Sequence, residues 1–363
     1  MRISAEAIAG EGTTQASSAS APVIGIPPRS ILAAGYVPLD IVSYRGNVWH
    51  AAGGTAGNVA ALLGFLGWAA SLVTDLGNDR AGRLARRDLV RANVSVDLVR
   101  LQRTVVTPRL VHEISANHHR YHFRCPSCGQ LFPHSRPLRA ERARELVRRR
   151  AAPDVFFFDR LNAGTLILAE HFSALGSLIV FEPSRPASEE KTRRAVASAD
   201  LIKHADDRQV GLDHIAVPKR QVRVITSGSR GARFAIGGGP WHQSPAFSYP
   251  VVDAGGAGDW TMAGLIHALP LGGRRTLRSV GDALRWAQAL AAVSCGAPGA
   301  RGLAQRQSAE AVLQATEFLE LHRDHLEISG VVPLGSRKSV SGTMCKWCLL
   351  PIAETPSLAA TSV

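Results

Sequence analysis

A glycine-rich turn followed by an aspartate is the segment of this chain best suited to chemistry. Residues 253–259 read DAGGAGD, and the apolar stretch that follows has helical spacing, which predicts a buried helix opening at the turn. The backbone amides of Gly256, Ala257 and Gly258 would then point from the helix N-terminus toward an anion. Asp259 would lie beside that anion, placed to take a proton from a hydroxyl that attacks a phosphoryl group. The alternative is a glycine turn with an Asp cap.

A second glycine turn occurs early in the chain, where residues 53–68 read GGTAGNVAALLGFLGW. The apolar spacing predicts a helix with Asn58 as its N-cap and Gly67 as its C-terminal stop. The pair Gly53-Gly54 ahead of it would let a ligand approach the backbone closely. A strand, a Gly/Asn/Asp turn and an amphipathic helix are predicted next.

With these turns the chain resembles the PfkB (ribokinase-like) family of carbohydrate and nucleoside kinases. That family has GG-x-x-x-N before a helix, then G-x-D-x-x-G, and finally D-[TS]-x-G-A-G-D near the C-terminus. The matching residues here are Gly53, Gly54 and Asn58, then Gly77, Asp79 and Gly82, then Asp253 through Asp259. The order and spacing match, and the resemblance covers roughly residues 30 to 305.

Alternating strand and helix patterns must position these turns. Strands are expected at 31–42 (ending near Asp40), 154–159, 177–183 and 221–228, and helices at about 138–150, 163–175 and 187–198. Continuous apolar strands between helices favour an α/β fold with an open, mostly parallel sheet covered by helices on both faces. Ligands of such sheets bind beyond the carboxyl ends of the strands. We therefore expect the turns after Leu39, Gly53 and Val252 to be strand-end turns.

Three regions are expected along the chain. Residues 1–27 are small and polar and predict a disordered tail, and residues 28–330 form the ribokinase-like kinase domain. Short alternating strands follow residue 98, and the resemblance implies that they form a small β lid over the sugar site, at about 98–136 with a CxxC insertion. Residues 331–363 form a C-terminal extension that carries a second CxxC.

The resemblance also assigns site residues. Asp40, Gly53, Gly54 and Asn58 would bind the acceptor, and Asp40 is otherwise a strand-end turn residue. Thr226 and Gly228 would border the nucleotide phosphates, and residues 291–302 would close over adenine. Asp253 would order the phosphate and cation end, and Asp259 would be the general base.

The function implied is transfer of a phosphoryl group from ATP, with Mg²⁺, to a hydroxyl of a sugar or sugar-containing small molecule. Two alternatives stay open: a nucleoside kinase, and a weak or inactive ligand-sensing, zinc-organised protein on the same scaffold.

Some positions depart from the family pattern. The family carries N-x-x-E, tied to magnesium through water, where this chain has Ala205 and Arg208; Asp206 or Asp207 could substitute. Trp260 replaces a small residue directly after the expected base, which would take space near the transferred group. These changes bear on metal handling and turnover more than on the fold.

Five cysteines are present, and four form two C-x-x-C pairs: Cys125 with Cys128, and Cys345 with Cys348. Together they have the count and spacing of a four-cysteine zinc site joining lid and tail. The alternatives are redox-active or merely reduced thiols. His118, His119 and His122 lie just upstream and could replace one cysteine.

The net charge of +13 is carried mainly by arginines. They are spread along several predicted helices without interleaved aromatic residues, so nucleic acid is not the expected partner. No apolar run reaches the roughly 18 residues that a membrane span needs. The N-terminus has no secretion signal pattern, so a cytoplasmic protein is expected, with the lid as a candidate homodimer surface.

Overall fold

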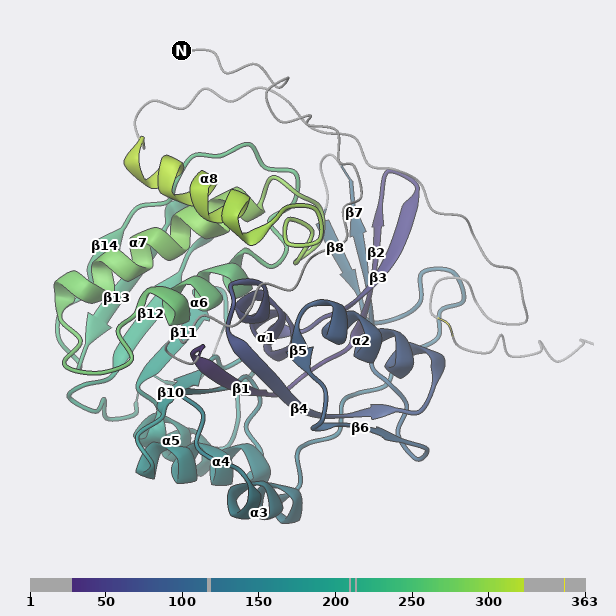
Figure 1. The fold of residues 1–363 in the computed structure, drawn as a ribbon, viewed down its shortest axis with the longest axis horizontal. Helices are drawn as coiled ribbons and strands as arrows, with labels where there is room; N and C mark the ends of the chain where they lie inside the picture. Colours follow the sequence, from purple (N-terminus) through teal and green to yellow (C-terminus); the bar gives the residue numbers. More distant parts are fainter. Residues whose placement is uncertain (1–27, 116–118, 209, 213, 323–348, 350–363) are drawn as a thin grey trace, which may run out of the picture.

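The centre of the molecule is a mostly parallel sheet of ten strands (Figure 1). The computed structural model describes residues 28–115, 119–208, 210–212, 214–322 and 349. The strands lie in the order β14-β13-β12-β11-β10-β9-β1-β4-β5, with β6 beside β4. Their bounds are β1 Ser30–Ala34, β4 Ala69–Gly77, β5 Val94–Ser95, β6 Val99–Gln102, β9 Val155–Phe158, β10 Leu178–Phe181, β11 Leu201–Ala205, β12 Val222–Thr226, β13 Ala232–Ile236 and β14 His242–Ser244. Neighbours from β12 to β5 are parallel, and β13 and β14 are antiparallel additions at one edge.

Helices cover both faces of this sheet, as expected (Figure 1). Alternate strand residues divide between two hydrophobic clusters, so that Ile31 faces one layer and Leu32 the other. The layer on the Ile31 face contains α1 Thr55–Phe65, α2 Arg80–Arg91, α6 Ala257–Ala268 and α7 Leu277–Ser294, with α8 Ala309–Leu321 packed on α7. The other layer contains α3 Ala140–Arg149, α4 Ala163–Ala174 and α5 Glu189–Ser198.

A second, four-stranded sheet projects from one side of this body in Figure 1, and we call it the lid sheet. Its order is β3-β2-β7-β8, with β2 Leu39–Tyr44, β3 Asn47–Ala52, β7 Arg109–Ile114 and β8 His119–His122. The central pair β2 and β7 is parallel, while both outer pairs are antiparallel. The lid is therefore built from two chain segments that lie far apart in the sequence.

Four expectations about strands were wrong. The apolar run 31–42 is two strands, because the chain leaves the large sheet after β1 and enters the lid at β2. Asp40 is accordingly the second residue of a lid strand, and Leu39 does not precede a strand-end turn. The segment expected to begin the lid forms β6, which pairs with β4. Val252 lies in a loop instead of following a strand, whereas Gly53 does follow one.

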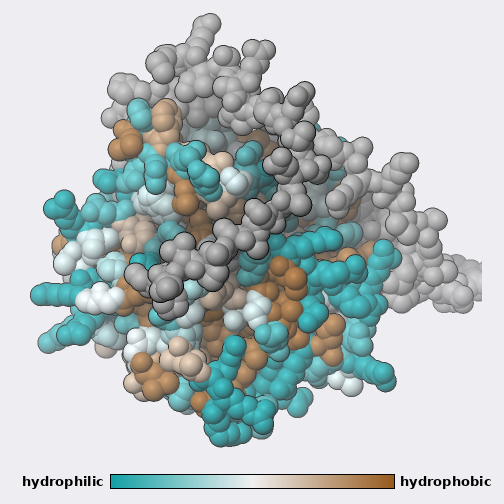
Figure 2. All heavy atoms as spheres, viewed as in Figure 1, coloured by the Kyte–Doolittle hydropathy of each residue, from teal (hydrophilic) through white to brown (hydrophobic). Residues whose placement is uncertain are grey.

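The surface agrees with a solvated, arginine-rich exterior. Figure 2 shows hydrophilic side chains spread over the visible face, with hydrophobic patches between them. Several exposed arginines are held in ion pairs with acidic neighbours, such as Arg194 with Glu170 at 2.8 Å. Within the described residues, no helix is both long and apolar enough to cross a membrane. The expected tails 1–27 and 331–363 lie outside the described residues, apart from Leu349.

Candidate active site

The predicted helix after the glycine turn is α6, and its N-cap is Gly256. Gly256 has φ +83°, in the left-handed region, and an added Cβ would come within 2.5 Å of the Ala300 Cα. Only glycine satisfies both conditions at low cost. The turn therefore holds the Gly258 amide at the start of a buried helix, where a bound anion is favoured, while the expected Ala257 amide donates to the Ala254 carbonyl at 3.2 Å.

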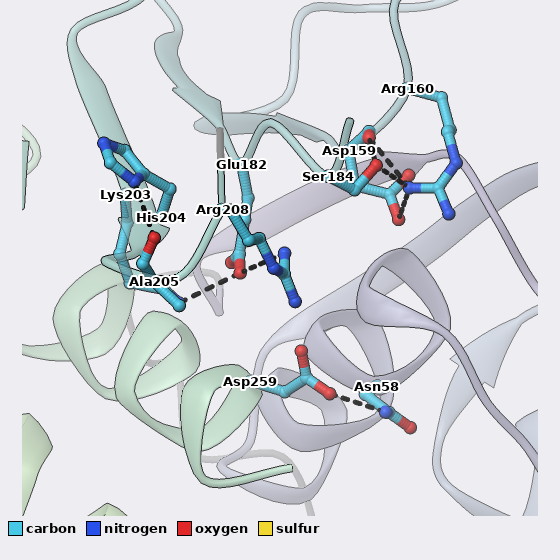
Figure 3. Close-up of polar contacts among 10 residues, drawn as sticks. All are labelled: Asn58, Asp159, Arg160, Glu182, Ser184, Lys203, His204, Ala205, Arg208 and Asp259. Carbon is cyan, nitrogen blue, oxygen red and sulfur yellow. Dashed lines mark hydrogen bonds and ion pairs between the residues drawn. The ribbon is translucent and has the colours of Figure 1, made fainter. Parts of the chain in front are cut away.

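Asp259 lies in the first turn of α6, and Asn58 donates a hydrogen bond from Nδ2 to its Oδ2 at 2.6 Å (Figure 3). The expected N-cap role of Asn58 was wrong, because α1 begins earlier, at Thr55, with Gly54 as N-cap. Asn58 thus points its side chain across to α6. Burial raises the pKa of Asp259 to about 6, and the nearby charge of Glu182 adds to the rise.

Asp40 reaches the same region from the lid. Its side chain packs against Gly53, where an added Cβ would lie 2.0 Å from the Asp40 Cγ. Burial raises the pKa of Asp40 to about 7, against the opposing charge of Arg301, and Asp259 contributes to the rise. Asp40 and Asn58 line one small pocket together. The structure therefore brings together an acceptor-side carboxylate, an amide and the Asp259 carboxylate.

Three charged residues in or directly after neighbouring strands were not singled out from the sequence (Figure 3). Asp159 directly follows β9 and Glu182 directly follows β10, while Lys203 lies within β11. Lys203 Nζ is 3.0 Å from Glu182 Oε1, and both side chains are buried. An added Cβ at Gly258 would lie 3.5 Å from Lys203 Nζ, so this ammonium borders the anion turn. The available signal was a polar residue directly after each buried strand.

Arg208 also enters this site from the stretch after β11. Its Nη1 lies 3.7 Å from Glu182 Oε1, and Figure 3 shows the guanidinium between Glu182 and Asp259. Arg208 lowers the pKa of Asp259 against the larger effect of burial. Ala205 ends β11, so a methyl group occupies the position where the family pattern has an asparagine. The expected departure therefore adds a cation to the site.

Asp159 forms a separate buried contact at the rim. It accepts a hydrogen bond from the Tyr36 backbone amide at 3.0 Å and pairs with Arg160 Nη1 at 3.1 Å. The Arg160 guanidinium lies over the Tyr36 ring, 4.8 Å from its centroid. Gly35 makes room for this carboxylate, because an added Cβ would collide with Asp159.

Asp253 anchors the turn itself. Its carboxylate accepts hydrogen bonds from the amides of Gly255 (2.8 Å) and Gly299 (2.7 Å), and His119 Nδ1 lies 2.8 Å from its Oδ1. Burial raises the pKa of Asp253, but these three contacts together hold it below its usual value. The 291–302 stretch is thereby tied to the glycine turn.

Thr226 and Gly228 lie at the carboxyl end of β12, the strand beside β11. Thr226 is the last residue of β12 and pairs in register with Ala205 of β11. Gly228 has φ +57° and begins a short 3-10 helix that ends at Arg230. A Cβ added at Gly228 would meet no atom within 4 Å, so there is open space beside the backbone at this position.

Trp260 takes no space from the phosphoryl side. Its side chain is 1% exposed, and its Nε1 donates to the Ala300 carbonyl at 2.9 Å. It packs edge-on against Phe65, with ring centroids 6.1 Å apart. The expected crowding was wrong because the indole points into the core.

The first cysteine pair occupies a tight turn. Gly129 N donates to Cys125 O at 2.8 Å, and Cys125 N donates to Gln130 O at 2.9 Å. Gly129 has φ +70°, which suits a knuckle-like turn, and Cys125 is buried while Cys128 is exposed. Cys345, Cys348 and His118 lie outside the described residues. His119 and His122 pair with Asp253 and Glu113.

Comparisons with known proteins agree with this geometry. Residues 193–306 match the profile described as pfkB family carbohydrate kinase. A curated relative, the ATP-dependent ribose-1-phosphate kinase of Halopiger xanaduensis, is 29% identical over 265 residues, covering 69% of this chain and 82% of the relative.

Solved structures with the same fold include two enzyme complexes. Aminoimidazole riboside kinase from Salmonella enterica, bound to aminoimidazole riboside and an ATP analog, has a TM-score of 0.59 and 18% identity, covering 79% of this chain and 100% of that chain. Arabidopsis thaliana ribokinase, bound to ribose and ATP, has a TM-score of 0.61 and 18% identity, covering 81% and 100%. At this identity the likeness establishes the fold.

Proposed function

We propose that this chain, which belongs to the pfkB family of carbohydrate kinases, transfers the γ-phosphoryl group of ATP to a hydroxyl of a phosphorylated pentose. It is a phosphotransferase with an alcohol acceptor. The observation that carries the proposal is the position of Asp259, half-buried in the first turn of α6 beside the Gly258 amide of the glycine turn.

Asp259 acts as the general base. Its pKa of about 6 leaves the carboxylate ionised at neutral pH yet more basic than an exposed aspartate. Asn58 holds one carboxylate oxygen at 2.6 Å, which fixes the orientation of the group. The acceptor hydroxyl gives its proton to Asp259 as its oxygen attacks the γ-phosphorus, and ADP leaves.

Positive groups offset the charge that develops on the transferred phosphoryl oxygens. The Gly258 amide lies at the N-terminus of α6 and Lys203 borders Gly258, whereas the Ala257 amide donates to the Ala254 carbonyl at 3.2 Å. Arg208 adds a guanidinium on the side of Glu182. Each of these donors is fixed before the reaction, so it stabilises the transition state without reorganising.

Mg²⁺ bound to the nucleotide phosphates would supply further positive charge. Glu182 Oε2 is buried without a hydrogen-bond partner and is the carboxylate oxygen that fits this ion. Because Arg208 already lies 3.7 Å from the other oxygen of Glu182, we propose that this chain relies less on a protein-held ion than the family pattern implies.

The acceptor would lie between the lid and α1. Asp40 and Asn58 would accept and donate hydrogen bonds to its hydroxyls, and Gly53 leaves the room that the Asp40 carboxylate occupies beside it. Two observations support an acceptor that already carries a phosphate: the name of the curated relative, and the partly exposed guanidinium of Arg160 at the rim.

The test is ATP consumption by the purified full chain with ribose 1-phosphate, ribose, fructose and aminoimidazole riboside, using Asp259→Asn as the background. We expect the highest kcat/KM with ribose 1-phosphate. Preference for unphosphorylated ribose would overturn the acceptor and keep the kinase. Consumption no higher than the Asp259→Asn background with every acceptor would instead favour a ligand-sensing protein.

For the cysteines we propose one structural zinc shared by Cys125, Cys128, Cys345 and Cys348. The tight turn at Cys125 supports it, and so does Leu349, which is buried in the same hydrophobic cluster as Cys125. Elemental analysis should find about one equivalent of thiolate-bound zinc. The variant Cys345→Ser/Cys348→Ser should lose this zinc and bind the acceptor more weakly than the parent chain does. Unchanged zinc content in that variant would contradict the shared site.

The lid is also our proposed homodimer surface, because Tyr121 and Phe123 are 50% and 62% exposed there. Light scattering should give a dimer mass that Phe123→Ser reduces, and a monomeric parent chain would rule the surface out. Use of ATP as phosphoryl donor makes the cytoplasm the proposed location.

A further inference from the structure

Two histidines of the lid sheet converge on one point above the glycine turn. His112 lies on β7 and His119 on β8, and their Nε2 atoms are in direct contact, with ring centroids 4.1 Å apart. Tyr121 stacks on the His112 ring at 4.7 Å and restricts its plane. The hairpin register pairs Tyr121 with His112, so the three rings project from the same face of the lid.

The backbone of the glycine turn is shaped to accept this pair. An added Cβ at Gly255 would lie 2.7 Å from the His119 Cε1 and 2.9 Å from the His112 Cε1. Both rings are therefore in contact with the turn that carries Asp259. The two histidines take no part in the proton transfer described above, so the reaction does not explain their position.

A buried carboxylate completes the cluster. Asp253 has a fully buried side chain, and its Oδ1 lies 2.8 Å from His119 Nδ1. Within the described residues, Asp253 forms an ion pair with the His119 imidazole and with no lysine or arginine. Possible ligand atoms of His112, His119 and Asp253 all lie within 4.8 Å of one another.

We propose that His112, His119 and Asp253 bind a divalent transition metal of the Zn²⁺, Co²⁺ or Ni²⁺ type, which joins the lid to the glycine turn. Imidazole nitrogens select such ions over Mg²⁺, which prefers oxygen ligands. Three protein ligands leave at least one coordination position for solvent or for an anionic ligand bound at the turn. Bound metal fixes the closed position of the lid, because its ligands come from both parts.

The alternative is a pair of imidazoles that share a proton. One ring would then donate from Nε2 to the other, and His119 would donate from Nδ1 to Asp253. That arrangement needs no metal and predicts no binding of one. The two accounts differ in metal stoichiometry, in the identity of the ligands and in the effect of metal on the lid.

The experiment is titration of the purified full chain with Co²⁺ in excess Mg²⁺, followed by visible absorption. We expect one equivalent bound through nitrogen and oxygen, in addition to any thiolate-bound equivalent. Thiolate coordination gives intense charge-transfer bands that the His/Asp site lacks, so Cys125→Ser/Cys128→Ser should remove those bands and keep the additional equivalent.

Two histidine variants locate the ligands. His112→Gln and His119→Gln should each weaken the additional equivalent by at least about tenfold, the lower end for loss of groups around a metal. His122→Gln is the matched control, because His122 lies on the same strand and contacts Glu113 instead of the cluster. It should bind as the parent chain does.

A measurement on the parent chain keeps the test independent of folding in the variants. Co²⁺ at the site should shift the proton resonances of two imidazoles by paramagnetic contact, and it should slow hydrogen exchange of β7 and β8. Absence of such shifts at saturating Co²⁺, or equal binding by the parent chain and the His112→Gln/His119→Gln double variant, would leave only a proton-sharing pair and overturn the proposal.

Discussion

Replacing Asp259 with asparagine should stabilise the fold while it removes activity. The pKa of this carboxyl rises from 3.8 to about 6 on folding, mainly through burial. Each pKa unit corresponds to about 1.36 kcal/mol, so holding the ionised carboxylate in the folded chain costs at most about 3 kcal/mol at pH 8. Asparagine has nearly the same shape, and its amide can keep the contact with Asn58.

The sign of the pH dependence follows from the raised pKa. The stability contributed by protonated Asp259 is fully present below the unfolded pKa of 3.8 and is lost as pH rises through about 6. The gain in unfolding free energy from Asp259→Asn should therefore be about 3 kcal/mol at pH 8 and only about 0.5 kcal/mol at pH 4. At pH 8, kcat should fall by about 10²–10⁴-fold.

Urea unfolding at both pH values and steady-state kinetics measure these quantities. Asp282→Asn is the matched control, since its side chain is 58% exposed, and it should change stability by less than about 0.5 kcal/mol. In the parent chain, kcat/KM should decline as pH falls below about 6. A stability gain of equal size at pH 4 and pH 8, or near-normal kcat in the variant, would refute the reasoning.

Three further changes test the rest of the site. Arg208→Gln should lower kcat by about 10²-fold. Arg230→Gln, which removes an exposed arginine paired with Asp206, is the control and should leave kcat unchanged. Equal kcat values for the two variants would exclude a role for Arg208 at the phosphoryl group. Ala205→Asn/Arg208→Glu should lower the Mg²⁺ concentration needed for half-maximal rate, and an unchanged requirement would mean that another group already serves. Gly53→Ala should raise the acceptor KM with little effect on the ATP KM, because the new methyl would meet the Asp40 carboxylate at 2.0 Å. Gly272→Ala is the control, because a Cβ there would have no atom within 4 Å. An unchanged acceptor KM in Gly53→Ala would place the acceptor elsewhere.

Local sequence patterns located several central strands of the large sheet and the helices that cover one of its faces. The apolar runs that became β9, β10 and β12 and the helical patterns of α3, α4 and α5 were located within a few residues. These elements are covered on both faces or amphipathic, so their periodicity is strong.

The lid was harder because its pairing is not local. The run from Ile31 to Val42 is mostly apolar and reads as one strand, although Pro38 marks the break between β1 and β2. The assignment of β2 to the lid depends on its parallel pairing with β7, which no local pattern encodes. The histidine cluster was missed for the same reason, since His112 meets His119 only after β7 and β8 pair.

The glycine turn and Asp259 could be found from composition and spacing, but their electrostatic surroundings could not. Lys203 and Glu182 are 21 residues apart in the chain, and their pairing depends on β10 and β11 being neighbours. From the sequence, Arg208 was interpreted as replacing the glutamate that the family pattern ties to magnesium. Its location between Glu182 and Asp259 makes it a source of positive charge instead (Figure 3).

The composition of the lid from two distant segments has a consequence for how the chain folds. Its central pairing joins Leu39 to Arg109, so it closes a long loop that contains α1, β4 and α2. Contacts of such high sequence separation form slowly, because the entropy of the loop must be lost before the pairing contributes stability. We expect the α/β core to become protected from hydrogen exchange first and the lid afterwards. A newly made chain would therefore pass through a stage in which the α/β core is folded but the acceptor cannot yet bind, because Asp40 has not reached Asp259.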